Sequence, residues 1–308
     1  MTAPADPQGA VLVGVDGSND GAHAVTWGAR EAARTDTQLR IVHASPWSML
    51  TERPRRADRA WDEAGLARRA RRIVEAAARH AREVEPDLTV DAELVCGVGP
   101  AALAQTCSGA ATVVVGRRGL GTQGTRQVGS AAAILAEQID AAVVVCGYDA
   151  QHSHLGGHDG PVVVGVDNPV RSDCSSDQRR VLDTAFALAD RRSASVRVVH
   201  AWNDADWGPG DPLAEYMSDW PTAKKDAQVS LEDLLAEWYQ RYPGVAVTVS
   251  VVDSRPAHAL VRASIGATVV VVGGCGRASL PGSRFGPVAR RVTTGANSPV
   301  LVVPTSDC

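Results

Sequence analysis

A glycine-rich segment, residues 116–130, has the composition of an anion-binding loop. Its glycines are spaced Gly116-x2-Gly119-x9-Gly129, and Ser130 follows. The apolar, β-branched run before the loop predicts a strand, and the alanine-rich run after it predicts a helix. Glycines let backbone approach a ligand closely, and a helix N-terminus offers unpaired N–H groups and the positive end of the helix dipole. We therefore predict a polyphosphate site in which Ser130 caps the helix or donates its hydroxyl to a phosphate.

The alternative interpretation of this segment is a glycine-rich turn that binds nothing. The same spacing recurs later in the chain as Gly273-x2-Gly276-x9-Gly286, again after an apolar run, which favours a binding function. In the second loop, Pro287 stands where the first has Ser130. Proline has neither a hydroxyl nor a backbone N–H, so we expect two phosphate donors to be missing there.

Parallel strands are the elements that would position such loops. Short apolar runs rich in β-branched residues predict strands that are buried on both faces of a sheet. Longer segments rich in Ala, Arg and Glu predict the helices between them, and Pro100 and Pro256 are expected in the first turn of a helix. This alternation predicts an α/β fold with an open parallel sheet, helices on both faces and ligands at the carboxyl ends of the strands. In the first half the predicted strands are 11–15, 39–43, 89–95, 112–116 and 142–146, and the clearest predicted helices are 22–34 and 62–85.

The chain contains this pattern twice. VLVGVDGS at 11–18 matches VVVGVDNP at 162–169, and RIVHA at 40–44 matches RVVHA at 197–201. From the second strand onward the offset stays near 157 residues, which indicates a tandem duplication. We predict a first domain at 1–148, a polar linker at 149–160 and a second domain at 161–308.

Composition limits the class of protein. The 308 residues are 44% hydrophobic with a formal net charge of −4, which indicates a globular chain and gives no sign of a nucleic-acid or membrane partner. The 6 cysteines are scattered without metal-like spacing, so we predict no metal site. No signal peptide and no membrane-length apolar run is recognisable in the sequence, and we expect a cytoplasmic protein.

The glycine loop, the early VGVDGS and the VHA motif together resemble the universal stress protein family in its tandem two-domain form. The resemblance covers essentially the whole chain. It implies two Rossmann-like domains, each with a mostly parallel five-stranded sheet, and a cleft for ATP or another adenine nucleotide, with or without Mg²⁺. It also implies that the two halves pair through their last strands. A homodimer of chains is compatible with the sequence, although no residue indicates one.

The resemblance assigns roles to individual residues of the first half. Asp16 matches an acid that contacts the ribose and base, and a carboxylate in that place is also suited to an Asx turn. Ala44 matches the position whose backbone contacts the adenine edge. His43 recurs as His200, and a structural histidine is preferred to a catalytic base because no nucleophile accompanies it. The implied nucleotide-binding residues are Gly14, Val15, Asp16, His43, Ala44, Gly116, Arg117, Gly119, Gly129, Ser130 and Ala131.

The second half departs from the pattern at its phosphate end. Beyond Pro287, the pair Asn168-Pro169 replaces the Gly17-Ser18 of the first half. We therefore expect the first domain to hold ATP, and the second to bind it weakly or to serve as a structural partner. The corresponding residues are Asp167, Ala201, Gly273, Gly276 and Gly286.

Signatures of common nucleotide-dependent enzymes are missing from the sequence. The only lysines, Lys224 and Lys225, form no Walker A motif and no kinase lysine, and there is no HExxH, GxSxG or strand-linked GxGxxG. We assign no catalytic residue and expect a regulatory stress-response protein for which the nucleotide is a ligand. The alternatives are a weak ATPase or related adenine-nucleotide enzyme, and a binder of cyclic nucleotides.

Overall fold

The structure is a computed structural model in which the chain divides into two compact units, Met1–Tyr148 and Asp149–Cys308. The residues that it describes are 9–45, 63–97, 99–119, 130–147, 160–167, 174–201, 220–276, 279 and 283–305. Among these residues no helix is long and apolar enough to cross a membrane, and no three His, Cys, Asp or Glu side chains are grouped so as to hold a metal ion.

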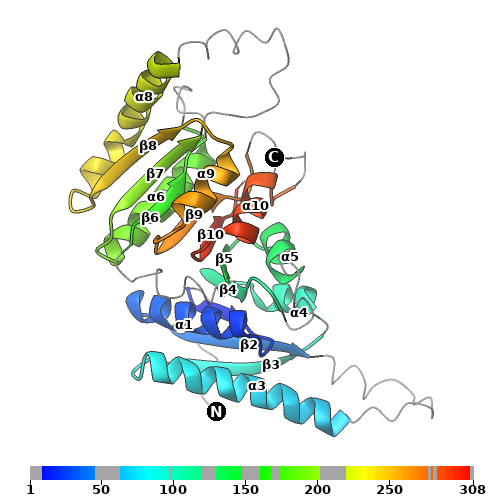
Figure 1. Cartoon of the computed structure of the whole chain (residues 1–308). Coiled ribbons are helices and arrows are strands. Elements are labelled where there is room, and N and C mark those ends of the chain that lie inside the picture. The colour runs from blue at the N-terminus through cyan, green and yellow to red at the C-terminus, as the bar shows by residue number, and fades with distance from the viewer. Residues whose placement is uncertain are drawn as a thin grey trace. The chain divides into compact units, whose positions relative to one another are not determined.

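The first unit alternates strands with helices (Figure 1). Its strand order is β3-β2-β1-β4-β5, and all neighbours in this order are parallel. The winding reverses between β1 and β4, which is where open sheets of this kind place a ligand. The elements are β1 (Val11–Gly14), α1 (Asn19–Arg34), β2 (Leu39–Ser45), α3 (Glu63–Val84), β3 (Val90–Cys96), α4 (Gly99–Thr106), β4 (Thr112–Gly116), α5 (Ser130–Gln138) and β5 (Ala142–Cys146).

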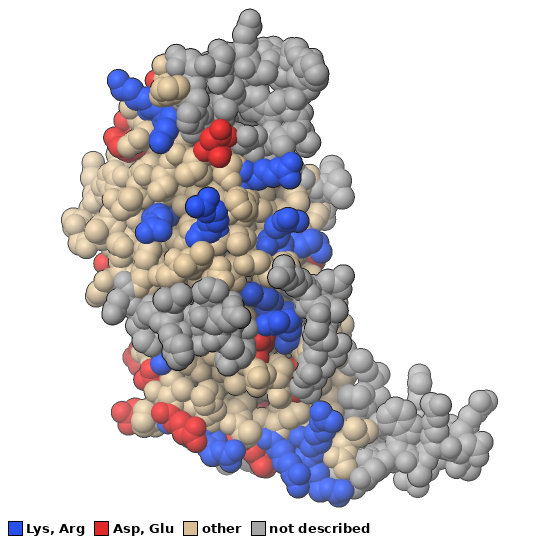
Figure 2. All heavy atoms as spheres, in the orientation of Figure 1, with Lys and Arg blue, Asp and Glu red and all other residues tan. Residues whose placement is uncertain are grey.

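Helices cover both faces of this sheet. Helix α1 packs on β1, β4 and α3, whereas α4 packs on β2 and α5. The core between this sheet and the helices α4 and α5 includes Leu12 of β1, Val113 of β4 and Leu135 of α5, each with an exposed fraction of 0%. Burial on both faces explains why the strands are continuous apolar runs without alternation. On the face shown in Figure 2, basic side chains concentrate over the N-terminal half of α3.

The second unit repeats the arrangement in the strand order β10-β9-β6-β7-β8, again with all neighbours in this order parallel. Phe186 of α6 and Trp238 of α8 pack together with ring centroids 6.3 Å apart, and α9 packs on β6, β7 and α10. The elements are β6 (Val162–Gly165), α6 (Ser176–Arg191), β7 (Val196–Ala201), α8 (Trp220–Arg241), β8 (Val247–Val252), α9 (Pro256–Ala263), β9 (Val269–Gly273), α10 (Pro287–Gly295) and β10 (Val300–Val303).

The predicted fold class, two α/β domains with five parallel strands each, is confirmed. Pro100 and Pro256 lie in the first turns of α4 and α9, as predicted. The predicted start of α1 at residue 22 is wrong, because the helix begins at Asn19. The hydroxyl of Ser18 accepts a hydrogen bond from the N–H of Gly21 at 3.1 Å and so caps the helix one turn earlier.

Candidate functional site

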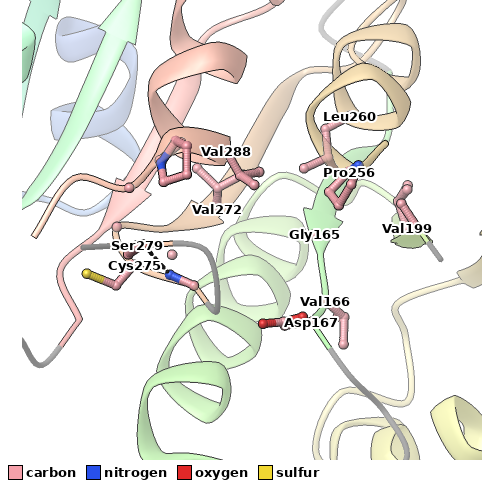
Figure 3. Close-up of a pocket in the computed structure, with 17 residues that line it drawn as sticks. Gly165, Val166, Asp167, Val199, Pro256, Leu260, Val272, Cys275, Ser279 and Val288 are labelled. Atoms are coloured by element: carbon pink, nitrogen blue, oxygen red, sulfur yellow. Dashed lines mark hydrogen bonds between the residues drawn. The ribbon is translucent and has the colours of Figure 1, made fainter. Parts of the chain in front are cut away.

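A pocket opens in the second half at the carboxyl ends of β6 and β9 (Figure 3). It lies where the winding of this sheet reverses, between the first residues of α9 and those of α10. Its volume of about 120 Å³ is below the range that usually encloses a whole small ligand, so a nucleotide would be only partly enclosed. The structure brings together all the site residues predicted for this half, which are Asp167, Ala201, Gly273, Gly276 and Gly286.

The glycines of the second loop lie where its two ends approach each other. A Cβ atom on Gly286 would lie 2.2 Å from the hydroxyl oxygen of Ser279, and one on Gly274 would lie 2.4 Å from the carbonyl oxygen of Arg284. The N–H of Gly286 donates to the carbonyl of Gly274 at 2.7 Å. The N–H of Gly276 donates to the Ser279 hydroxyl at 3.0 Å. Internal packing of the loop therefore requires the small residues, whether or not a ligand is bound.

The N-terminus of α10 forms one wall of the pocket. Gly286 is the N-cap, Pro287 is the first helical residue, and no side chain of the described residues caps the helix. The first backbone bond of the helix runs from the N–H of Arg290 to the carbonyl of Gly286 at 3.0 Å. The N–H groups of Val288 and Ala289, two residues that line the pocket, thus precede this bond and remain available to an anion.

The rest of the pocket is mostly apolar. Val166, Val199 and Leu260 line it together with Val272. Figure 3 shows Val166 just after the end of β6 and the other three on β7, α9 and β9. Asp167 lies at the exposed end of this wall. A Cβ atom on Gly276 would lie 4.0 Å from a carboxylate oxygen of Asp167, so the acid faces the glycine loop.

The two recurring histidines have the same hydrogen bond. The Nδ1 atom of His43 lies 2.7 Å from the carbonyl oxygen of Val15, and the Nδ1 atom of His200 lies 3.1 Å from that of Val166. Each histidine therefore ties the end of β2 or β7 to the turn that follows β1 or β6. This geometry agrees with a structural histidine that positions the turn before Asp16 or Asp167.

In the first half, Asp16 lies against the start of the glycine loop. One of its carboxylate oxygens accepts a hydrogen bond from the N–H of Ser18 at 3.0 Å, which is the Asx turn that the sequence predicts. A Cβ atom on Gly119 would lie 2.7 Å from the other carboxylate oxygen. A Cβ atom on Gly116 would lie 2.9 Å from the backbone of Asp20, so both glycines allow the loop to contact the turn between β1 and α1.

Arg117 and Arg118, at the start of the first loop, have structural partners. The backbone N–H of Arg118 donates to the Asp20 carboxylate at 2.9 Å, and its guanidinium lies 3.4 Å from the same oxygen. Asp20 is 5% exposed, so Arg118 compensates a buried charge. Arg117 covers Gly147, where a Cβ atom would lie 2.5 Å from the guanidinium carbon. These contacts favour anchoring of the loop over phosphate binding by the two side chains.

The remaining predicted residues of the first half lie around the same end of the sheet. Gly14 is the last residue of β1, and a Cβ atom there would lie 2.5 Å from a methyl carbon of Leu103. Ala44 lies near the end of β2. Ser130 and Ala131 are the first two residues of α5. Gly129 lies outside the described residues.

Sequence reasoning missed Ser279 and the Asp20–Arg118 pair. Ser279 shapes the second loop through its bond to Gly276, yet a serine between glycines carries no distinctive signal. Asp20 and Arg118 are far apart in the chain, and only the parallel pairing of β1 with β4 brings them together. The one sequence signal for this contact is an Asp shortly after β1 and an Arg shortly after β4, and this signal is weak.

Comparison with known proteins agrees with this architecture. The model of the universal stress protein family matches residues 9–147 and again residues 160–304. The chain is similar to universal stress protein Rv2005c of Mycobacterium tuberculosis, with 32% identity over 98% of this chain and 99% of that protein. It is also similar to universal stress protein Rv2623 of the same species, with 32% identity over 95% of each chain.

Solved structures show the same fold. A universal stress protein from Archaeoglobus fulgidus aligns with a TM-score of 0.65 and 15% identity, covering 96% of this chain and 98% of the other. The resemblance inferred from the glycine loops and the VGVD and VHA motifs is thus confirmed over both halves. The chain belongs to the universal stress protein family, with two family domains in tandem.

Proposed function

We propose that the protein is an adenine-nucleotide-binding regulatory protein of the stress response, in which the nucleotide acts as a ligand. The observation that carries this proposal is the pocket at the carboxyl ends of β6 and β9, where a glycine loop meets the uncapped N-terminus of α10. The chain also belongs to the universal stress protein family, and resemblance to this family implies a cleft for an adenine nucleotide.

The chemistry of the pocket suits the parts of a nucleotide. Val166, Val199 and Leu260 offer an apolar surface to a base, and Asp167 can accept hydrogen bonds from ribose hydroxyls. The N–H groups of Val288 and Ala289 point out of a helix N-terminus, where the dipole favours phosphate oxygens. In this arrangement the base lies toward α9 and the phosphates lie toward α10.

The first half is proposed to bind the nucleotide more tightly. Its helix α5 begins at Ser130, which has the hydroxyl and the N–H that Pro287 of α10 lacks. We propose that residues 14–16, 43–44, 116, 117, 119 and 129–131 form this site. Two clefts of unequal affinity would let the protein respond to nucleotide over a wider range of concentration than two equal ones.

Ligand binding without obligatory turnover fits the groups around the second-half pocket. Among the described residues that line it, Asp167 is the single carboxylate, no histidine is present, and Cys275 is disulfide-bonded. Hydrolysis of a phosphoanhydride is usually assisted by a base or a metal close to the reacting phosphate. Asp167 belongs by position to the sugar end of the proposed site.

The test is nucleotide content followed by titration. The purified protein is denatured, and released nucleotide is quantified by chromatography and mass spectrometry before and after incubation with Mg-ATP. We expect about one tightly held ATP per chain and weaker binding of a second by calorimetry. Accumulation of ADP well above a protein-free control would support the ATPase alternative, and the absence of any uptake of ATP would refute the proposal.

A matched pair of variants assigns the second site. Gly286→Ala places a methyl group against Ser279 and should weaken the second binding event. Gly244→Ala is the control, since a Cβ atom there meets nothing within 4 Å. If both variants bind ATP like the wild type, the second-half pocket is not the nucleotide site.

We also propose that the halves pair through β5 and β10, the strands at the ends of their respective five-strand orders. Both are rich in valine, and an exposed apolar edge strand promotes aggregation. Hydrogen exchange on the intact chain tests this pairing. Slow exchange of amides along both strands is expected, and fast exchange at both would contradict it.

A further inference from the structure

A second cavity lies between α1 and α3 of the first half, on the other side of the turn that carries Asp16. Its volume of about 320 Å³ falls within the range of small-molecule sites. The floor is apolar, with Val15, Val25 and Ile73 beneath small residues of both helices. We call this cavity the α1–α3 groove, and its lining is Val15, Gly17, Ser18, Gly21, Ala22, Val25, Arg69, Arg72, Ile73, Ala76, Ala77 and His80.

At the groove, α1 has a small residue where the second half has a large one. Helices α1 and α6 follow the N-caps Ser18 and Ser175, so Ala22 corresponds to Arg179. Helices α3 and α8 end at equivalent positions, so His80 corresponds to Glu237.

In the second half these two positions form an ion pair. Arg179 donates to the carboxylate of Glu237, and its guanidinium also lies 5.5 Å from the centroid of the Trp238 ring. The pair thus bridges α6 and α8 at the place where the first half has its cavity. Ala22 cannot make such a bridge, and its side chain is exposed.

The charge of the groove has one sign. Arg69 and Arg72 lie on the same face of α3, and both are exposed. Neither forms an ion pair with any residue that the structure describes. No Asp or Glu is among the described residues of the lining.

We propose that the α1–α3 groove binds a small organic anion with an apolar body, such as a medium-chain carboxylate. The apolar floor accounts for the body of the ligand, whose burial is favourable in proportion to its area. Arg69 and Arg72 account for the head group, because guanidinium groups bind carboxylates through paired hydrogen bonds. In the second half the Arg179–Glu237 ion pair lies at the equivalent positions of α6 and α8, so we expect no such binding there.

The groove is distinct from the proposed nucleotide cleft. Only Val15 is common to the groove and to the residues proposed for nucleotide binding. The Asp16 carboxylate faces Gly119 of the glycine loop, and it is not part of the groove lining. The proposal therefore does not depend on whether the protein binds ATP.

The experiment is a titration of the full chain with octanoate. Binding is measured by calorimetry and by the NMR shifts of the backbone amides of α1 and α3. Acetate has the same head group without the apolar body, and octan-1-ol has the body without the charge. We expect saturable binding of octanoate, and binding of acetate and of octan-1-ol that is at least roughly fivefold weaker. Equal binding of acetate and octanoate would overturn the proposal, since simple attraction of anions to arginines would explain it.

Two variants and one control locate the binding site. Arg69→Gln with Arg72→Gln should weaken octanoate binding roughly five- to tenfold, the effect of losing two exposed ion pairs. Arg71→Gln removes a charge from an exposed position of the same helix outside the lining, and it should bind octanoate like the wild type.

Ala22→Arg with His80→Glu recreates the ion pair of the second half and should abolish binding. Each variant is compared with the wild type by circular dichroism and thermal unfolding. Undiminished binding by the folded double arginine variant, or by the folded Ala22→Arg/His80→Glu variant, would overturn the assignment to this groove.

Discussion

The N-terminus of α10 offers a direct test of how the second half would hold phosphate. The N–H groups of Val288 and Ala289 line the pocket, whereas Pro287 supplies neither N–H nor hydroxyl. Pro287→Ser introduces both groups at the first helical position. A hydrogen bond to a charged group stabilises a complex by about 1.5–3 kcal/mol, and the open pocket favours the lower figure. We therefore expect the affinity of the second site for ATP to rise about tenfold.

The cost of this substitution to folding is small. Proline is favoured at the first helical position, and its removal increases the entropy of the unfolded chain. We expect a loss of about 0.4–1 kcal/mol in the free energy of unfolding, which leaves the protein folded.

Calorimetry with ATP and with adenosine isolates the phosphate contribution. Adenosine binds through base and ribose alone, so its affinity should be the same in the wild type and in Pro287→Ser. The reciprocal change, Ser130→Pro in the first half, should weaken ATP binding by a similar factor. The reasoning is refuted if Pro287→Ser leaves the ATP affinity unchanged, or if adenosine gains as much as ATP.

Three further predictions concern chemistry and stability. Burial raises the pKa of the Cys107 thiol to about 12, so an alkylating reagent at about pH 8 should modify exposed Cys96 and spare Cys107. Mass spectrometry measures the labelling of each cysteine, and equal labelling of the two would contradict this prediction. Trp238 is 1% exposed, so Trp238→Ala should lower the free energy of unfolding by about 3–5 kcal/mol in denaturant titrations. Tyr239 lies on the same helix but is 37% exposed, and Tyr239→Ala should lower it by under ~1 kcal/mol. Equal losses of stability in the two variants would be inconsistent with this packing. Burial lowers the pKa of His23 below its ordinary value of 6.5, so at acidic pH the unfolded chain binds a proton that the folded chain does not. The free energy of unfolding should therefore fall as the pH is lowered through 6.5. His23→Gln should reduce this pH dependence, and an unchanged profile would exclude His23 as its source.

The sequence predicted the strands, the duplication and the family because each has a periodic or repeated signal. Valine runs such as Val113–Val115 belong to strands covered on both faces, and this burial is what removes the alternation of polar residues. The position of Asp16 and of the glycine loops also followed from pattern, since the carboxyl ends of neighbouring parallel strands meet at one edge.

Side-chain directions within loops could not be predicted, because loops have no fixed period. Arg118 compensates the buried carboxylate of Asp20 through a contact between residues that are far apart in the chain. The sequence alone shows that Pro287 has neither a backbone N–H nor a hydroxyl to donate to a phosphate. The two N–H groups beyond it became apparent only when the structure placed Val288 and Ala289 against the pocket.

The α1–α3 groove had no sequence signal because it depends on residues that are small. Ala22 and Ala76 are ordinary helix formers, and nothing in their spacing distinguishes the lining of a groove from a solvent-exposed helix face. Comparison of the two halves supplies the missing information. The same backbone position carries Ala22 in one half and Arg179 in the other, and only the larger residue spans the space between the helices.

The two helix pairs have the same place in the order of elements but pack differently. Phe186 and Trp238 pack between α6 and α8, whereas the equivalent positions of α1 and α3 are the buried residues Ala29 and Ala81. Paired alanines let helices approach closely at that level, while aromatic rings fill a wider space. Beyond its alanines, toward the N-terminus of α1, the first pair has no side chain equivalent to Arg179. The α1–α3 groove lies there, and Arg69 and Arg72, which form no ion pair with any residue that the structure describes, define the charge that a ligand would carry.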